Sequence, residues 1–410
     1  MRATIIPSEL DPNTQLRLAG YLEQIGELLG NKTRRGTFAQ YALGLFGDTS
    51  RKSAEPIAAT LCPDPSESQA LHFKLCNFLR RSPWLDAPIR QFATRHALDA
   101  MQTRCPIRTW IIDDTGFLKK GDKSPGVHRQ YTGSAGKVTN CQVAVSLTLA
   151  SETAHVPADF RLYLPKVWTE DRKRCREARI PDDIVFAPKW KLALDMITSA
   201  VGAGMPPGVV CADSGYGDTG DFRDGIENLG LSFAVGIHRT TVVRRTRGTK
   251  RRRLDPAQSV QELAFSLPAA RFRKVTWRDG TKTKLSAKTT AVRVQVEHGD
   301  GRAPTEQWLL IEWPDGEHLP SKFALSNLPP STSLKRLFLL TKERWRVERC
   351  YQDLKGQLGL DHFEGRSFTG WHHHVTIALC CYAFCVAEHA RSFFPSASRT
   401  ATARTLHVAA

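Results

Sequence analysis

The sequence predicts a mixed α/β sheet flanked by helices, with an all-α region before the sheet and a β-rich insertion within it. Three observations lead to this fold class. Apolar residues recur at helical spacing across residues 14–105, short apolar strands alternate with helical segments from residue 106, and strand-like segments gather in residues 238–320. A chain of 410 residues is long enough for two or three domains.

The helical region defines a predicted N-terminal domain of residues 1–105, and the sheet core follows in two parts, residues 106–237 and 321–392, around the insertion. In the first part, strands are expected at 107–112, 138–149, 161–164, 208–212 and 231–237, with a helix at 184–201 and a Gly-rich basic loop at 116–137. In the second part, one helical pattern runs from residue 334 past 355, another covers 371–390, and residues 393–410 form a tail.

The chain carries 58 Lys and Arg residues against 41 Asp and Glu residues, a net charge of +17. This excess favours a polyanionic partner, and eight of the positive charges fall within residues 239–253. No apolar run approaches the ~18 residues of a membrane span. The ten cysteines form no CxxC pair, and most lie in apolar stretches, which is typical of buried thiols in a reducing cytoplasm rather than of a zinc site.

Three acidic residues stand out by position. Asp114 closes one apolar strand, Asp213 closes another, and Glu348 lies within a predicted helix. Carboxylate oxygens are the ligands that Mg²⁺ prefers, and two such ions promote phosphoryl transfer. Each residue also suits a structural role, since Asp is common in turns and a helical Glu348 pairs readily with Arg344.

Helix geometry, at ~100° per residue, places Arg344, Glu348 and Lys355 within roughly 40° of one another. A carboxylate between two cations suits a metal ligand with phosphate-binding groups on either side. It equally suits a stripe of surface ion pairs.

Five motifs, in order along most of the chain, resemble one family: the insertion-sequence transposases with a ribonuclease-H-like core and an Asp-Asp-Glu triad. Within it, the resemblance is to insertion-sequence family seven hundred and one, in the broader family-four group. The motifs are RKSAEPIA (51–58), DDTGFLKKGDKSPGVHRQYTGSAGKVTNCQVAVS (113–146), ADSGYGD (212–218), RWRVERCYQDLKGQLGLDHFEGRS (344–367) and GWHHH (370–374).

The resemblance implies that Asp114, Asp213 and Glu348 form the catalytic triad and hold two Mg²⁺ ions, or Mn²⁺. Asp113 remains a rival of Asp114, because the faces of a strand alternate. Arg344 and Lys355 match the family-four signature and are expected to bind phosphates. Where that signature has Tyr, this chain has Thr341. Tyr351, one turn after Glu348, is not assured to replace it.

Further cations are expected to bind DNA phosphates: Lys119, Lys120, Arg129, Arg244, Arg245, Arg251 and Arg252. The resemblance also implies a DNA hairpin intermediate with an aromatic ring stacked on a flipped base. Trp277, Trp308 and Trp313 are the candidates, although a core position is favoured for each. Residues 133–137 do not match a P-loop, so no nucleotide cofactor is expected. His372, His373 and His374 are expected at a helix start near DNA rather than on a metal.

These features together predict a cut-and-paste DNA transposase. The helical domain would bind terminal inverted repeats, and the core would cut the element ends and join the 3′-hydroxyl to target DNA. A homodimer on double-stranded DNA is expected, since two ends are cut together, and so is a bacterial, cytoplasmic, nucleoid-associated location. The alternatives are a catalytically silent, transposase-derived DNA-binding regulator and a structure-specific repair nuclease.

Overall fold

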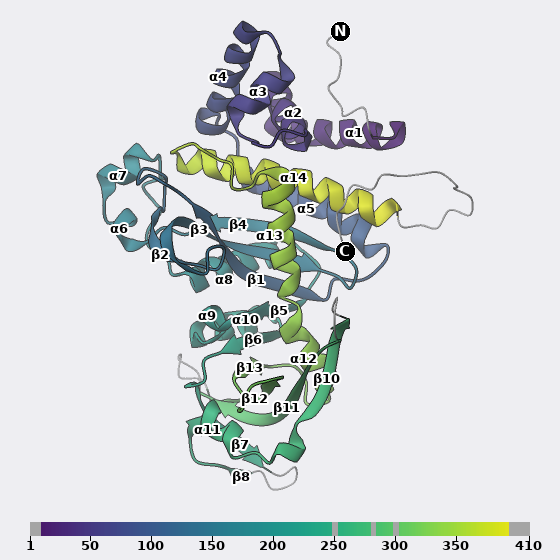
Figure 1. Ribbon diagram of the computed structural model, residues 1–410, viewed down its shortest axis with the longest axis vertical. Helices are drawn as coiled ribbons and strands as arrows, with labels where there is room; N and C mark the ends of the chain where they lie inside the picture. The colour runs from purple at the N-terminus through teal and green to yellow at the C-terminus, as the bar shows by residue number, and fades with distance from the viewer. Residues whose placement is uncertain (1–9, 248–252, 280–283, 298–302, 393–410) are drawn as a thin grey trace, which may run out of the picture. The chain divides into compact units, whose positions relative to one another are not determined.

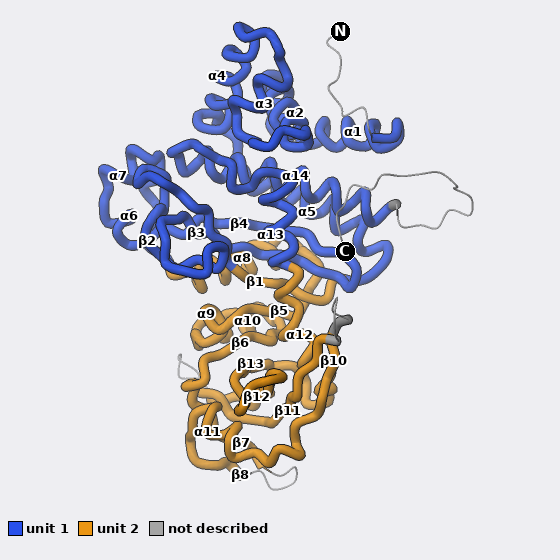
Figure 2. The backbone as a smooth tube through the Cα atoms, in the orientation of Figure 1, with its two compact units in different colours: residues 1–106, 114–187, 347–410 blue, residues 107–113, 188–346 orange. Residues whose placement is uncertain are grey.

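The computed structural model describes residues 10–247, 253–279, 284–297 and 303–392 (Figure 1). The chain divides into two compact units (Figure 2). Unit 1 comprises residues 1–106, 114–187 and 347–410, and unit 2 comprises residues 107–113 and 188–346. The units share two elements, because β1 (Thr109–Leu118) and α13 (Trp345–Leu358) each begin in unit 2 and continue in unit 1.

Unit 1 begins with an all-helical region, as predicted. Asp11, Asn31 and Asp64 each cap a helix by accepting two backbone N–H groups, and Gly30 ends the first helix with φ 69°. The helices are α1 (Pro12–Leu29), α2 (Lys32–Phe46), α3 (Ala54–Leu61), α4 (Pro65–Arg81) and α5 (Asp86–Gln102).

The helix α14 (Phe368–Ser392) packs against α1, α2, α4 and α5 of the N-terminal region, and its course beside α5 is visible in Figure 1. The buried Tyr21 hydroxyl donates to the Cys380 carbonyl at 2.9 Å. The buried Arg90 guanidinium pairs with Asp86 and Asp159 and donates to Thr376. The N-terminal helices therefore share one core with the last described helix.

The strands that lie wholly in unit 1 are β2 (His128–Thr132), β3 (Lys137–Ala150) and β4 (His155–Leu162), and β3 pairs antiparallel with both others. Two short helices follow, α6 (Lys166–Thr169) and α7 (Arg172–Glu177). The basic loop expected at 116–137 is wrong in part, because β1 extends to Leu118 and β2 lies within it. Gly116 supports a close contact, since a Cβ there would lie 1.9 Å from Thr132 Oγ1.

Unit 2 begins with the first residues of β1, which run parallel to β5 (Val209–Ala212), and β5 runs parallel to β6 (Phe233–Ile237). The helices are α8 (Lys189–Gly202), α9 (Ser214–Gly217) and α10 (Gly220–Asn228). The predicted helix at 184–201 starts later than expected because Pro188 disfavours helical conformation in the residue before it.

The insertion extends this same sheet. Its elements are β7 (Val242–Arg247), β8 (Arg253–Leu254), β9 (Gln258–Ser259), α11 (Val260–Phe265), the 3₁₀ turn Ala269–Arg271, β10 (Arg273–Asp279), β11 (Lys284–Val296) and β12 (Thr305–Pro314), followed by β13 (Lys322–Ser326). From β6 the strand order is β6-β13-β12-β11-β7-β8, with antiparallel pairing. The helix α12 (Leu334–Lys342) packs Leu337 and Phe338 onto this layer.

The fold class is therefore confirmed: a mixed α/β, ribonuclease-H-like sheet flanked by helices, with an all-α start and a β-rich insertion. All ten cysteines are free thiols, and most are buried. Among the helices of the described residues, none has the length and apolar character that crossing a lipid bilayer requires.

Candidate active site

Asp113 and Asp213 are brought together by two parallel strands. Thr109, Trp110 and Ile111 of β1 pair with Val209, Val210 and Cys211 of β5. Continuing that register by two residues places Asp113 opposite Asp213. Aligned residues on neighbouring strands point to the same face of the sheet, so both carboxylates lie on one face of unit 2.

The loop after β5 fixes the conformation of Asp213. The carboxylate Oδ1 accepts the Gly215 N–H at 2.9 Å and caps the short helix α9. Gly217 lies flat against β6, because a Cβ there would come 2.2 Å from the Gly236 carbonyl oxygen. Asp218 accepts hydrogen bonds from the His238 N–H and the Thr241 hydroxyl. The ADSGYGD motif is thus a rigid connection that leaves the Asp213 side chain 39% exposed.

Arg344 connects the two carboxylates. One guanidinium nitrogen donates to Asp113 Oδ2 at 3.2 Å, and the other lies 3.7 Å from Asp213 Oδ2. Asp113 is buried, with 9% of its side chain exposed. All three residues belong to unit 2.

The continuous helix expected from residue 334 past 355 is wrong. α12 ends at Lys342 and α13 begins at Trp345, so Arg344 lies in the turn between them. The common helical stripe of Arg344, Glu348 and Lys355 therefore does not form, although Glu348 and Lys355 remain on α13. The Thr341 hydroxyl, at the Tyr position of the signature, bonds to the Phe338 carbonyl at 2.8 Å.

Asp114 does not close its strand, since β1 continues for four residues beyond it. Successive side chains of a strand alternate, so Asp114 points to the face opposite Asp113. It belongs to unit 1, as does Glu348, which is exposed in the first turn of α13. Tyr351, one turn after Glu348, is buried and bonds to the Ser146 hydroxyl at 2.6 Å, which anchors α13 on β3.

Two of the predicted phosphate-binding lysines contact the protein itself. Lys355 Nζ donates to the Gly116 carbonyl at 2.7 Å, and Lys119 Nζ donates to the Phe363 carbonyl at the same distance. Burial lowers the pKa of both ammonium groups.

The other predicted phosphate ligands differ in exposure. Lys120, Arg129 and Arg244 are exposed. Arg245 is partly buried, and burial is the main cause that lowers its pKa. Arg251 and Arg252 lie outside the described residues.

Residues 133–136 form the turn between β2 and β3, whereas a P-loop connects a strand to a helix.

The three consecutive histidines lie near the start of α14, as expected, but His373 and His374 are buried in the core. His373 bonds to the Leu79 and Trp84 carbonyls, and His374 bonds to the Tyr41 hydroxyl and the Gly359 carbonyl. Burial lowers the pKa of His374 to about 4. His372 is partly buried, its Nδ1 lies 3.0 Å from the Phe368 carbonyl, and burial lowers its pKa to about 4.

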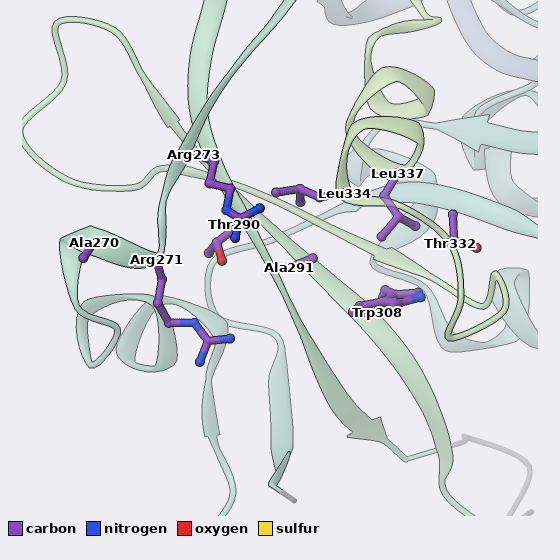
Figure 3. A pocket seen from close by; sticks show the side chains of 9 residues that line it. All are labelled: Ala270, Arg271, Arg273, Thr290, Ala291, Trp308, Thr332, Leu334 and Leu337. Carbon is purple, nitrogen blue, oxygen red and sulfur yellow. The ribbon is translucent and has the colours of Figure 1, made fainter. Parts of the chain in front are cut away.

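The three insertion tryptophans are partly buried, and two of them, Trp277 and Trp308, pack against the cluster around Leu337 and Phe338. Trp308 also lines a cavity of about 460 Å³ in unit 2. Figure 3 shows this cavity with Arg271 and Arg273 on one side and Trp308, Leu337 and Thr332 on the other. Cations and an aromatic ring thus line one polar cavity.

Asp113, in the middle of β1, and Asp213, directly after β5, offer the oxygen donors that a hard divalent cation takes. Within the residues that the structure describes, no three His, Cys, Asp or Glu side chains form a group able to hold a metal ion. The structure thus brings Asp113 and Asp213 to one guanidinium in unit 2, while Asp114 and Glu348 lie in unit 1.

The pairing of Asp113 with Asp213 depends on the register between β1 and β5. The strands expected at 107–112 and 208–212 differ in length, so the sequence pattern alone did not choose between Asp113 and Asp114. Arg271 and Arg273 were missed because no motif marks them.

Comparisons with known proteins agree with this class of site. The model of the DDE superfamily endonuclease family matches residues 24–284, and that of the transposase DDE domain matches residues 186–384. Since the first match covers well over half of the chain, the protein belongs to the DDE superfamily of endonucleases.

One relative is the "Probable transposase for insertion sequence element IS701" of Microchaete diplosiphon. The two proteins are 31% identical over 201 residues, which is 49% of this chain and 48% of the relative. The match therefore spans about half the length of that relative.

Proposed function

We propose that this protein is a metal-dependent DNA transposase that cuts the ends of an insertion sequence and joins them to target DNA. The observation that carries the proposal is the pair of carboxylates, Asp113 and Asp213, held by Arg344 on aligned parallel strands. Membership of the DDE superfamily and the similarity to a probable transposase support the same reaction class.

Of the two adjacent aspartates, we favour Asp113 as the first triad residue. It is buried on the face that carries Asp213 and contacts the same guanidinium, whereas Asp114 points to the opposite face. Glu348 on α13 remains the proposed third member, on the basis of its motif.

Asp113, Asp213 and Glu348 would hold the Mg²⁺ or Mn²⁺ ions, which when bound supply a nucleophilic hydroxide or 3′-alkoxide and stabilise the leaving oxygen. The backbone N–H of Gly215 orients Asp213, because it donates to the carboxylate. Arg344 neutralises part of the carboxylate charge and offers a planar donor that suits a phosphate oxygen.

The cavity beside Trp308 supports a hairpin intermediate. A flipped nucleotide needs an apolar or aromatic surface for its base and cations for its phosphate, and Trp308, Arg271 and Arg273 provide both. We propose Trp308, rather than Trp277 or Trp313, as the stacking residue, since it is the tryptophan that lines this cavity.

The remaining parts of the proposal concern assembly. The N-terminal helices would bind terminal inverted repeats, a homodimer would pair the two ends, and the protein would act on the bacterial nucleoid in the cytoplasm. The transposition would follow a cut-and-paste route.

The test is a cleavage assay on end-sequence DNA with Mg²⁺ or Mn²⁺, using wild type and the isosteric variants Asp113→Asn, Asp213→Asn and Asp114→Asn. Asp113→Asn and Asp213→Asn are expected to lose at least about 10³-fold in cleavage rate while still binding DNA, whereas Asp114→Asn loses less than about 10-fold.

The reverse ranking of Asp113→Asn and Asp114→Asn would restore Asp114 as the triad member. A wild type that binds the ends but never cuts would support the silent regulator instead. Cleavage without preference for the ends, and without strand joining, would indicate a repair nuclease.

A further inference from the structure

Lys355 connects helix α13 to strand β1 within unit 1. Its ammonium group donates to the Gly116 carbonyl at 2.7 Å and to the Ser134 hydroxyl at 3.1 Å, and it lies 5.3 Å from the centre of the Phe117 ring. Ser134 in turn bonds to both the N–H and the carbonyl of Gly116. The lysine thus reaches a strand segment whose polar groups already converge on one point.

Lys119 makes the reciprocal connection. It follows β1 directly, and its ammonium group donates to the carbonyl of Phe363 in the segment after α13. Its own backbone is fixed on β3, because its N–H donates to the Asn140 carbonyl and its carbonyl accepts from the Asn140 side chain. One lysine therefore runs from α13 to β1, and the other runs from the end of β1 to the segment after α13.

The surroundings favour a fixed role for both groups. Phe117 is 2% exposed and stacks edge-on against Trp371, so the strand between the two lysines is firmly packed. Both lysines are half-buried, and burial lowers the pKa of each. An ammonium group that serves as a phosphate ligand needs access to the DNA backbone, which these two positions restrict.

We propose that Lys355 and Lys119 are positioning residues: a double tether within unit 1 that fixes the end of β1 against α13, which carries Glu348, and against the segment that follows α13. The tether replaces the phosphate contacts expected from sequence. It rests on the proposed function only for its purpose, which is to keep α13, the helix of the proposed metal ligand Glu348, in a fixed position on the unit 1 part of β1.

The experiment compares Lys355→Met and Lys119→Met in the full chain with Lys120→Met, an exposed neighbour that keeps the length and loses the charge. The first readout is hydrogen exchange, in which residues 113–121 are expected to exchange at least 10-fold faster in both tether variants and unchanged in the control. The second readout is the Mn²⁺ concentration that gives half of the maximal increase in melting temperature. This midpoint is expected to rise about 10-fold in both tether variants. Neither readout requires cleavage, so an inactive wild type would count against the proposed function and leave the tether testable.

DNA affinity as a function of salt separates the tether from a phosphate contact. The tether leaves the slope of log K against log salt unchanged, whereas loss of a phosphate contact reduces its magnitude by about 0.9 per lysine. A reduced salt slope in the tether variants would overturn the proposal. A lower melting temperature would also overturn it if hydrogen exchange at residues 113–121 and the Mn²⁺ midpoint both stayed unchanged. If Lys355→Met fails to fold, Ser134→Ala takes its place, because it removes one acceptor of the Lys355 ammonium group. This variant must also show faster exchange at residues 113–121 and a higher Mn²⁺ midpoint, each by a smaller factor. Lys355→Arg, which keeps the positive charge, is expected to restore the wild-type exchange rate.

Discussion

Three lysines of unit 1 and three arginines of the insertion in unit 2 use their charge in different ways. In unit 1, Lys52, Lys119 and Lys355 point inward and donate to backbone carbonyl groups. In the insertion, Arg244, Arg271 and Arg273 are exposed. Both groups count equally in the net charge of +17, yet the first is buried or half-buried and the second is exposed.

The difference teaches that the role of a cation depends on what its side chain contacts. A buried lysine that donates to carbonyls holds the backbone in one conformation, since breaking the bonds leaves buried acceptors without partners. An exposed arginine has little to stabilise in the protein and offers five donors to a phosphate.

Acidification is expected to have the largest effect, and to act on unit 1. Burial depresses the folded-state pKa of His374 to about 4, below its usual 6.5, so unfolding takes up a proton as pH falls. The contribution of neutral His374 to the free energy of unfolding is complete above pH 6.5 and is lost as the pH falls toward 4. At pH 5 the free energy of unfolding is expected to be lower by about 2 kcal/mol because of this residue.

Hydrogen exchange at pH 7 and pH 5, corrected for the intrinsic rate, checks this loss. Protection in α14 should fall, while protection in β11 and β12 of unit 2 should remain, because the described histidines of unit 2, His238 and His318, are exposed. Equal losses in both units would contradict the assignment to the buried histidines.

Removal of an inward lysine comes next. Lys52→Met is expected to lower the free energy of unfolding by about 2 kcal/mol, because Lys52 Nζ donates to the carbonyls of Leu45 and Gly47, and the residue is 6% exposed. Urea unfolding measures the change, with the exposed Arg244→Gln as the control, for which less than about 0.5 kcal/mol is expected. If Arg244→Gln lowered the free energy of unfolding as much as Lys52→Met, the exposed arginine would stabilise the fold as much as the buried lysine, and the comparison would be wrong.

Removal of outward arginines should have the smallest effect on stability and a measurable one on DNA. The double variant Arg271→Gln/Arg273→Gln is expected to bind DNA roughly 10-fold more weakly at low salt and to reduce the magnitude of the salt slope by about 1.8. Fluorescence anisotropy across a salt series measures both quantities. An unchanged slope would show that the insertion cavity does not contact phosphates.

Much of the fold was predictable because it depends on local pattern. Helical spacing identified α1 and α4, and the strand before Asp213 was identified by its apolar residues. The length of β1 was not predictable, because Gly116 resembles a loop residue until its close approach to Thr132 of β2 is known. The break between α12 and α13 has no Pro or Gly to mark it.

The candidate site divides in the same way. Asp213 and Glu348 were placed on the elements that carry them, since each depends on one segment of sequence. Asp113 and Asp114 are adjacent, and the choice between them depends on a register with a strand about a hundred residues later. The partners of Lys119 and Lys355 are also distant in sequence, which is why charge alone predicted a different role.

The packing of α14 against the N-terminal helices has a consequence for synthesis on the ribosome. Tyr21, Tyr41 and Arg90 have their partners on a helix that begins at residue 368, so α1, α2 and α5 lack part of their core until α14 has emerged. A product truncated before α14 would expose those apolar faces and be degraded or aggregate. A shortened version of this protein is therefore a poor source of a free-standing DNA-binding repressor.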